Sequence, residues 1–520
     1  MNLLNDPVFT VRTFDGPEKC SLPRIYRLLW TDQVEGFAKL QAHQKQAWHC
    51  FLAQLGAIAT EDREMPDSGD GWREALSALT CREAWNLYTE DLSKPAFMQP
   101  PVPEETLEQF SEIHPTEYDA LTLSKNHALK IRRMQSSEPE HWVYLLVNVQ
   151  TTGYYSGGGR RTSRMNGGYG SRPFFGITPS LRLGQWIRRD IRVLKDHISE
   201  IESHLSFNFS RNVSPLLWTV PWEGNDSLEL SELHPLYIDC ARRIRRGEKN
   251  WQKSDTGTER VTGDIGGQTG DPWAPVNEAE GKVLNPSPAD FGYRNLREIL
   301  LGGDYRRPIS FKQPTDGYIV CRGIFTNPDK QGGTRDHYRE RVIRFSNTES
   351  DNPFENTEES QVAEEAEYRV EKAGQAESIL SHALDYMLRD DITEGDIPGT
   401  SKDGKKTGLK AVKQNQIDAL NARIDQRFFE KLFRASEMSD KARSQFWETA
   451  LVGALRAQWE DAKSFCPAKD QWHRLARAKS TLDRRIKYTF THAKQTAKFN
   501  EHTKAEEEKE ESNARPVADL

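Results

Sequence analysis

The segment at residues 156–176, SGGGRRTSRMNGGYGSRPFFG, combines the residue types that suit contact with a phosphate backbone. Three consecutive glycines precede two consecutive arginines: Gly157, Gly158, Gly159, Arg160 and Arg161. Glycine lets another molecule approach the main chain closely, and arginine donates hydrogen bonds to phosphate oxygens. Arg164 and Arg172 follow among further glycines. The segment therefore predicts a nucleic-acid-binding loop, with a loop between solvated basic surfaces as the alternative.

Two further basic runs follow this segment. They are WIRRDIRVLK, with Arg188, Arg189, Arg192 and Lys195, and CARRIRRGEK, with Arg242, Arg243, Arg245 and Arg246. Both runs suit contact with phosphate as additional binding surface. A solvent-exposed helix face would show the same pattern, so composition leaves the two interpretations open.

Enzymatic motifs are weak by comparison. In RDHYRE, Asp336 and His337 could ligate a metal ion, which gives a metal-dependent nuclease as an alternative hypothesis. However, no HExxH-type spacing accompanies them. GTSKDGKK (399–406) resembles a phosphate-binding loop, but Lys406 stands where serine or threonine would hold magnesium. We therefore expect a protein that is not an enzyme, with no metal and no cofactor.

Composition bounds the class of protein. The chain has 520 residues and a net charge of −7, and acidic residues collect around 348–367 and in KAEEEKEES near the end. No apolar run reaches the length of a membrane span, and the first residues lack the pattern of a signal peptide. We expect a cytoplasmic protein that does not contact membranes. The six cysteines are scattered, which disfavours a zinc site and a disulfide framework.

The elements that must position these residues form two different patterns. Residues 1–360 mix short alternating runs, such as VFTVRT, with helical patches such as VLKDHISEIESHL. The apolar run at 142–150, WVYLLVNVQ, is compatible with a buried helix or a strand. Residues 249–270 and 346–360 are polar enough to be loops. This part predicts a large, irregular, mixed domain.

Residues 361–500 predict a four-helix bundle, which makes the whole chain α+β. Apolar residues recur there at helical spacing in four stretches. Residues 501–520 form an acidic tail without aromatic residues, for which we expect disorder. The predicted helix faces contain Ile379, Ala383, Tyr386 and Met387; Ile417, Leu420, Ile424, Phe428 and Leu432; Phe446, Ala450 and Ala454; and Trp472, Leu475, Leu482 and Ile486.

The sequence resembles the large subunit of the type I-E CRISPR surveillance complex Cascade, the CasA family. The resemblance rests on motifs within residues 1–345 that stand in the family's order. They are FMQPP, LTLSKNHALKIRRM, TTGYYSGGGRRTSRMNGGYGSRPFFG, LLWTVPWEG, GDPWAPV, REILLGG and RGIFTNPDKQGGTRDHYRERVIRF. The family also has a mixed N-terminal domain followed by a four-helix bundle.

The resemblance implies a non-catalytic protein of a prokaryotic cytoplasm. Within a crRNA-guided complex, it would recognise the protospacer-adjacent motif (PAM) of invading double-stranded DNA through the minor groove. It would then promote strand separation and R-loop formation, and recruit the helicase-nuclease. The implied partners are the backbone, small and crRNA-processing subunits, the crRNA, the target duplex and the helicase-nuclease. A generic RNA-binding protein is a further alternative.

The resemblance also assigns roles to residues of this chain. Gly157, Gly158 and Gly159 would enter the minor groove, where a Cβ would collide. Lys282 would be a lysine that reaches the same groove. The loop that contacts the PAM and docks on the guide-bearing backbone corresponds to Lys125, Asn126, His127, Ala128 and Leu129. The wedge that separates the strands corresponds to a hairpin tip, with Asn327, Lys330 and Gln331 as candidates.

Overall fold

The structure is a computed structural model, and none of the helices it describes has the length and apolar composition of a membrane span. The chain divides into two compact units, Met1–Glu358 and Glu359–Leu520. Among the described residues, the first mixes helices with four small sheets and the second contains helices, so the predicted fold class is confirmed. The described residues are 1–113, 138–153, 161–166, 170–203, 208–247, 251–262, 265–312, 317–328, 334–345, 354, 360–389, 407–435 and 438–495.

The N-terminal unit begins with a three-stranded antiparallel sheet in the order β2-β1-β3. Its strands are β1 (Phe9–Thr13), β2 (Gly16–Cys20) and β3 (Val34–Phe37). Helices follow at α1 (Leu22–Trp30), α2 (Lys45–Ala59) and α3 (Gly69–Ser77). Every residue of α2 after Lys45 is buried, which is typical of a helix at the centre of a core.

The apolar run at 142–150 lies in a helix, α5 (Pro139–Thr151). Pro139 stands in the first turn, where its missing N–H removes no helical hydrogen bond. The buried carboxylate of Glu140 accepts hydrogen bonds from the Thr10 backbone N–H at 2.6 Å and from the Thr10 hydroxyl at 2.9 Å. These bonds tie the start of α5 to β1. The helix thus ends just before the glycine-rich segment, and the residues that follow it, Thr152 and Gly153, are still buried.

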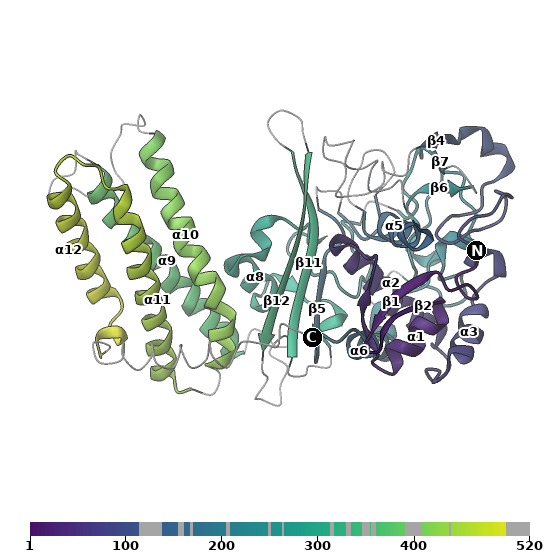
Figure 1. Cartoon of the computed structure of the whole chain (residues 1–520), viewed down its shortest axis with the longest axis horizontal. Helices are drawn as coiled ribbons and strands as arrows, with labels where there is room; N and C mark the ends of the chain where they lie inside the picture. The colour runs from purple at the N-terminus through teal and green to yellow at the C-terminus, as the bar shows by residue number, and fades with distance from the viewer. Residues whose placement is uncertain are drawn as a thin grey trace. The chain divides into compact units, whose positions relative to one another are not determined.

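A long β-hairpin dominates the sheet with the order β12-β11-β5 (Figure 1). The strands are β5 (Phe174–Thr178), β11 (Gly317–Pro328) and β12 (Thr334–Phe345). β11 and β12 pair along their whole length, from Gly317 opposite Phe345 to Pro328 opposite Thr334. β5 pairs only with residues 318–322 of β11. The hairpin therefore extends beyond β5 towards its tip.

The remaining strands of this unit form two small antiparallel sheets. One contains β4 (Ser111–Ile113), β7 (Trp251–Ser254) and β6 (Arg243–Arg246), in that order. The other contains β10 (Tyr305–Arg306), β8 (Val276–Asn277) and β9 (Lys282–Val283). The further helices are α6 (Leu183–Asp196), α7 (Ile198–Ser203) and α8 (Tyr293–Leu301).

The interpretation of residues 249–270 as a polar loop is wrong in part. Residues 251–254 form β7, and Val261 and Thr269 are buried. Arg260 is also buried, with its guanidinium over the ring of Trp222 at 5.1 Å from the centroid. Polar composition misleads here because the polar side chains find partners inside the unit.

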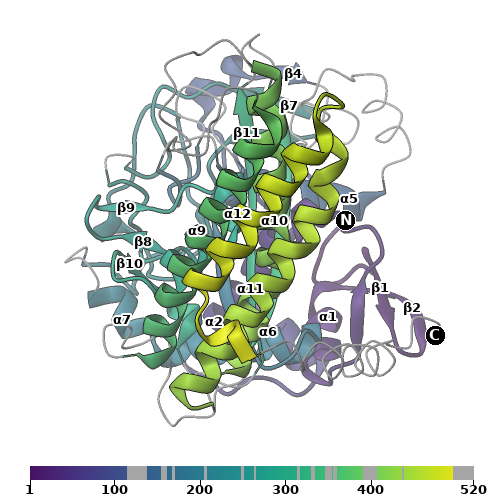
Figure 2. The ribbon, with the colours of Figure 1, turned by 90° about the vertical axis from the view of Figure 1, so that its left-hand side faces the viewer.

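In the described part of the C-terminal unit, four long helices form a bundle, which Figure 2 shows from one side. They are α9 (Gln361–Leu388), α10 (Thr407–Arg434), α11 (Asp440–Ala462) and α12 (Gln471–Thr489). Leu420, Ile424 and Phe428 of α10 are buried, as their spacing predicts. The tail at 501–520, the linker at 346–353 and the phosphate-loop-like stretch at 399–406 lie outside the described residues.

One predicted bundle face is displaced, and one residue of another predicted face is exposed. In α11 the buried stripe contains Trp447, Leu451 and Leu455, one position after the predicted Phe446, Ala450 and Ala454. Both stripes have the same spacing, and the one with the larger apolar side chains is buried. Trp472, predicted to face the core, is 86% exposed at the start of α12.

Candidate nucleic-acid interface

Three of the predicted site residues lie within the described part of the chain: Arg161, Lys282 and Asn327, the last by its backbone alone. The others lie outside it, and they are Lys125, Asn126, His127, Ala128, Leu129, Gly157, Gly158, Gly159, Arg160, Lys330 and Gln331. The structure does describe the residues on both sides of the glycine loop, on both sides of a second glycine cluster at residues 167–169, and on both strands of the hairpin. These flanking residues define how the candidate site is held.

The described residues that flank the glycine loop are Gly153, after the end of α5, and Arg161. Thr152 and Gly153 remain buried, and the Gly153 N–H donates to the carbonyl of Asn148 at 2.9 Å. At the other end, Arg161 Nε lies 2.7 Å from Glu259 Oε1. Both ends of the loop are therefore attached to the unit by specific contacts.

The residues that follow Arg161 are buried in a polar network. The Ser163 N–H and hydroxyl both donate to Asp239 Oδ2 at 2.8 Å. The guanidinium of Arg164 lies over the Tyr237 ring at 4.3 Å from its centroid and donates to the Tyr237 carbonyl at 3.0 Å. Burial raises the pKa of Asp239, against the opposing effect of these hydrogen bonds. The prediction that Arg164 reaches phosphate is wrong, because its side chain is enclosed by protein.

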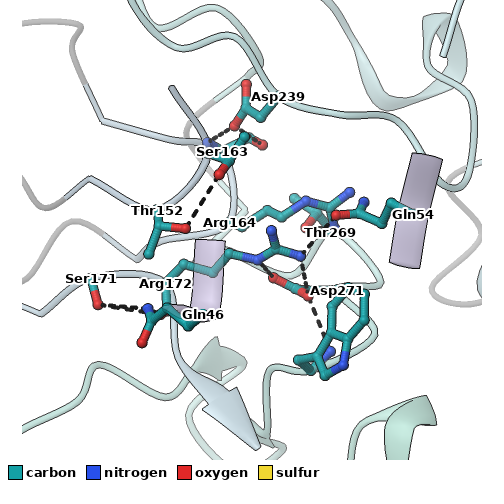
Figure 3. Close-up of polar contacts among 12 residues, drawn as sticks. Gln46, Gln54, Thr152, Ser163, Arg164, Ser171, Arg172, Asp239, Thr269 and Asp271 are labelled. Atoms are coloured by element: carbon teal, nitrogen blue, oxygen red, sulfur yellow. Dashed lines mark hydrogen bonds and ion pairs between the residues drawn. The ribbon is translucent and has the colours of Figure 1, made fainter. Parts of the chain in front are cut away.

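Arg172 is enclosed in the same way. Its guanidinium forms a two-pronged ion pair with Asp271, at 2.6 Å from Nε to Oδ2 and 2.8 Å from Nη2 to Oδ1, as Figure 3 shows. Burial raises the pKa of Asp271, but the positive charge of Arg172 outweighs burial, and the pKa is lowered overall. The predicted phosphate contact by Arg172 is therefore also wrong. Arg172 instead joins the end of the glycine-rich segment to Asp271 in the core.

Two glutamines of the buried helix α2 complete this network (Figure 3). Gln46 Nε2 donates to the Arg172 carbonyl at 2.8 Å. Gln54 Nε2 donates to the carbonyls of Leu236 and Tyr237 at 3.2 and 3.1 Å. Helix α2 therefore holds the backbone at two places, Arg172 and residues 236–237. Sequence reasoning missed these residues, because a glutamine in an apolar helix has no signature of its own.

The second glycine cluster, residues 167–169, is flanked by residues that contact β9 and β11. Before it, Asn166 Nδ2 donates to the Val283 carbonyl at 2.8 Å. After it, the Gly170 N–H donates to Asn285 Oδ1 at 2.7 Å, and the Ser171 N–H donates to the Ile324 carbonyl at 2.7 Å. These bonds connect the glycine-rich segment with the strand that contains Lys282 and with the hairpin.

Lys282 lies exposed on β9, immediately before the residue that accepts from Asn166. The strand packs closely against residues 266–268. A Cβ on Gly266 would lie 2.7 Å from the Gly281 carbonyl oxygen and 3.1 Å from Cγ of Lys282. Gly266 has a φ of +60°, which favours glycine at this close approach. The site of Lys282 is therefore a firmly supported position on the surface.

The hairpin extends from the same junction. Ile324 and Phe325 of β11 are buried, and a Cβ on Gly323 would lie 2.8 Å from Cβ of Pro286. Asn327 lies opposite Arg335, one pair before the end of the ladder. Asp336 and His337, the residues of the nuclease hypothesis, lie opposite Thr326 and Phe325. No three His, Cys, Asp or Glu residues gather as a metal site in the described part of the chain.

The basic run at 242–246 is structural. Arg243 donates to the side chains of Thr106, Gln109 and Ser254 at 2.6–2.8 Å. Arg245 donates to three backbone carbonyls at 2.9–3.1 Å, and burial lowers its pKa to about 10. The prediction that this run adds phosphate-binding surface is wrong for these two arginines, since both are fully buried.

Comparison with solved structures identifies this fold. No protein-family model and no curated protein matches the sequence. The CRISPR-associated protein Cse1 from Acidimicrobium ferrooxidans is 14% identical with a TM-score of 0.62, over 94% of this chain and 98% of that one. The CasA of Thermus thermophilus is 15% identical with a TM-score of 0.59, over 94% and 99%. A chain of a CRISPR RNA-guided surveillance complex gives 12% identity, a TM-score of 0.50, and coverage of 93% and 99%. This chain has the Cse1/CasA fold over nearly its whole length.

Proposed function

We propose that this chain is the large subunit of a crRNA-guided type I-E Cascade complex. In this role it recognises the PAM of invading double-stranded DNA through the minor groove and promotes strand separation. The observation that supports the proposal most strongly is the Cse1/CasA fold over 94% of the chain. The sequence motifs of that family stand in the same order in this chain. The protein acts by binding, without catalysis and without a cofactor.

Hydrogen bonds join the residues beside the glycine-rich segment to β9 and to β11, which supports a different role for each part of the site. Gly157, Gly158 and Gly159 enter the minor groove, where the bare main chain fits the narrow space. Lys282, exposed on β9, adds positive charge beside them. The segment from Lys125 to Leu129 contacts the PAM and the guide-bearing backbone. Guide pairing supplies sequence specificity, so a short duplex element is all the protein reads.

The hairpin supplies the wedge that opens the duplex. Its tip candidates are Asn327, Lys330 and Gln331, at the end of an unbroken ladder of paired residues. Unstacking one base step costs a few kcal/mol. A hairpin tip can keep the two bases apart only if the rest of the protein holds the tip in place. The hydrogen bond from Ser171 to Ile324 gives the hairpin such support from the glycine-rich segment. Binding of the PAM by the glycine-rich segment would therefore bring the hairpin tip to the base pairs that it separates.

The implied partners are the other Cascade subunits, the crRNA, the target duplex and a recruited helicase-nuclease. The test is a gel shift of the guide-loaded complex, assembled with and without this chain, against duplexes randomised beside the protospacer. The proposal predicts that binding requires the chain and selects a few flanking sequences, which name the PAM. Binding that ignores both the chain and the flank would refute it, and would favour a generic nucleic-acid-binding protein.

A further inference from the structure

A pocket of about 310 Å³ lies on α6. It is lined by Pro179, Gln185, Arg188, Arg189 and Arg192. The four helical residues recur at the spacing of neighbouring turns, so they share one face of α6. Three guanidinium groups therefore line one small pocket.

Two of these arginines are held in place by neutral partners. The guanidinium groups of Arg188 and Arg192 lie 5.6 and 5.8 Å from the ring centroid of Trp30. Arg188 also donates to the carbonyls of Trp30 at 2.8 Å and Gly184 at 3.2 Å. Within the described ranges, neither arginine forms an ion pair with a carboxylate. Their positive charges are thus oriented but not neutralised.

Arg189 adds an unmet donor. Its side chain is nine-tenths buried, with Nη1 donating to Asp190 at 2.8 Å and to the Ser310 carbonyl at 2.7 Å, and Nη2 donating to the Lys312 carbonyl. Its Nε has no hydrogen-bond partner among the described residues. Arg189 therefore keeps one buried N–H without an acceptor next to the pocket, which is costly.

This pocket is distant from the end of the β11–β12 ladder that leads to the proposed wedge. Pro179 follows β5, whose last residue, Thr178, lies opposite Tyr318 of β11. The tip of the hairpin begins after Pro328. At about 3.3 Å per residue, the ten steps along the strand from Tyr318 to Pro328 span about 33 Å. The pocket thus lies near the end of β11 that is far from the wedge.

We propose that this pocket binds a phosphate group. Guanidinium groups on successive turns offer N–H donors from several directions, which matches the tetrahedral arrangement of phosphate oxygens. A phosphate group offers more acceptor oxygens than a carboxylate, which has two, and so suits donors from three arginines better. The phosphate belongs to a nucleic-acid strand or is free, since both offer the same oxygens. The inference goes beyond the proposed function, which assigns no contact to α6.

The test uses the full chain and two probes, inorganic phosphate by calorimetry and a short single-stranded oligothymidylate by fluorescence anisotropy. Arg192→Gln is the test variant, because Arg192 is exposed and its loss leaves the core intact. Arg182→Gln is the control, because Arg182 pairs with Asp32 at 2.9 Å and does not line the pocket. We expect Arg192→Gln to weaken binding by about tenfold, and the control to leave it unchanged.

The two probes distinguish the source of the phosphate. If Arg192→Gln weakens only oligonucleotide binding, and the slope of log affinity against log salt concentration falls by about 1, the pocket binds a phosphate of a strand. Selective loss of inorganic phosphate binding assigns it to free phosphate. Equal binding by the wild type and both variants would overturn the proposal. Tighter binding of polyglutamate than of either probe, if Arg192→Gln abolishes it, would also overturn the proposal. The ligand of the pocket would then be an acidic peptide.

Discussion

Arg172 and Arg188 belong to neighbouring elements of the chain, yet they occupy opposite environments. Arg172 is buried against the carboxylate of Asp271, whereas Arg188 lies over Trp30 at the pocket on α6. Local sequence does not distinguish them, since both stand in basic runs beside aromatic residues. The difference is a carboxylate 99 residues away in the sequence. The partner found in three dimensions decides whether an arginine supports the fold or remains available to a ligand.

The largest effect we expect comes from removing the buried arginine. Arg172→Met would leave Asp271 buried without its partner, which costs about 3–5 kcal/mol. Arg182→Met is the matched control, because its pair with Asp32 is half exposed and should contribute less than about 1 kcal/mol. Urea denaturation of the full chain, followed by tryptophan fluorescence, measures both. Equal, small losses would erase the distinction between the two kinds of arginine.

A smaller loss is expected where the glycine-rich segment meets residues 285 and 286. The Cβ of Gly170→Ala would lie 2.5 Å from Asn285 Oδ1 and 2.7 Å from the Pro286 carbonyl oxygen. Such overpacking costs about 1–3 kcal/mol. The control is Gly69→Ala, because nothing lies within 4 Å of a Cβ there and the residue begins α3. If the two variants unfold at the same urea concentration, the junction is not tightly packed.

Substitution of the exposed Lys282 should weaken binding of DNA by the complex and leave the stability of the chain unchanged. In the assembled complex, Lys282→Gln should weaken binding to a PAM-bearing duplex by about tenfold, or ~1.4 kcal/mol. The slope of affinity against salt should fall by about 1, because one phosphate contact is lost. Lys19→Gln is the control, since Lys19 pairs with Glu138 on another surface. A gel shift over a range of salt concentrations measures both variants, and equal affinity for them would remove Lys282 from the interface.

Local patterns predicted the fold class well. Alternation identified β1, and helical spacing identified four bundle helices. The buried stripe of α11 was misplaced because two adjacent stripes share one spacing, and side-chain size decides between them. The 142–150 run stayed undecided because an apolar run is compatible with either structure.

The environment of the basic residues was predicted poorly, for a physical reason. Ser163 meets Asp239 across 76 residues, and Arg172 meets Asp271 across 99. Charge patterns report the local chain, while such pairs depend on the tertiary fold. At Gly170 the sequence indicated close approach by another molecule, whereas the atoms that approach it belong to Asn285 and Pro286 of this chain. The resemblance assigns Lys282 to the groove that the glycine loop would enter. Its strand contacts the glycine-rich segment, and its role stays a prediction.

The most direct test of the account is binding by the guide-loaded complex that contains Gly158→Asp. Two targets are compared, a PAM-bearing duplex and a PAM-free single strand. A carboxylate and a Cβ in the minor groove should weaken duplex binding strongly and leave single-strand binding unchanged, because guide pairing does not involve the loop. Equal loss on both targets, or no loss on either, would contradict the claim that this segment reads the duplex.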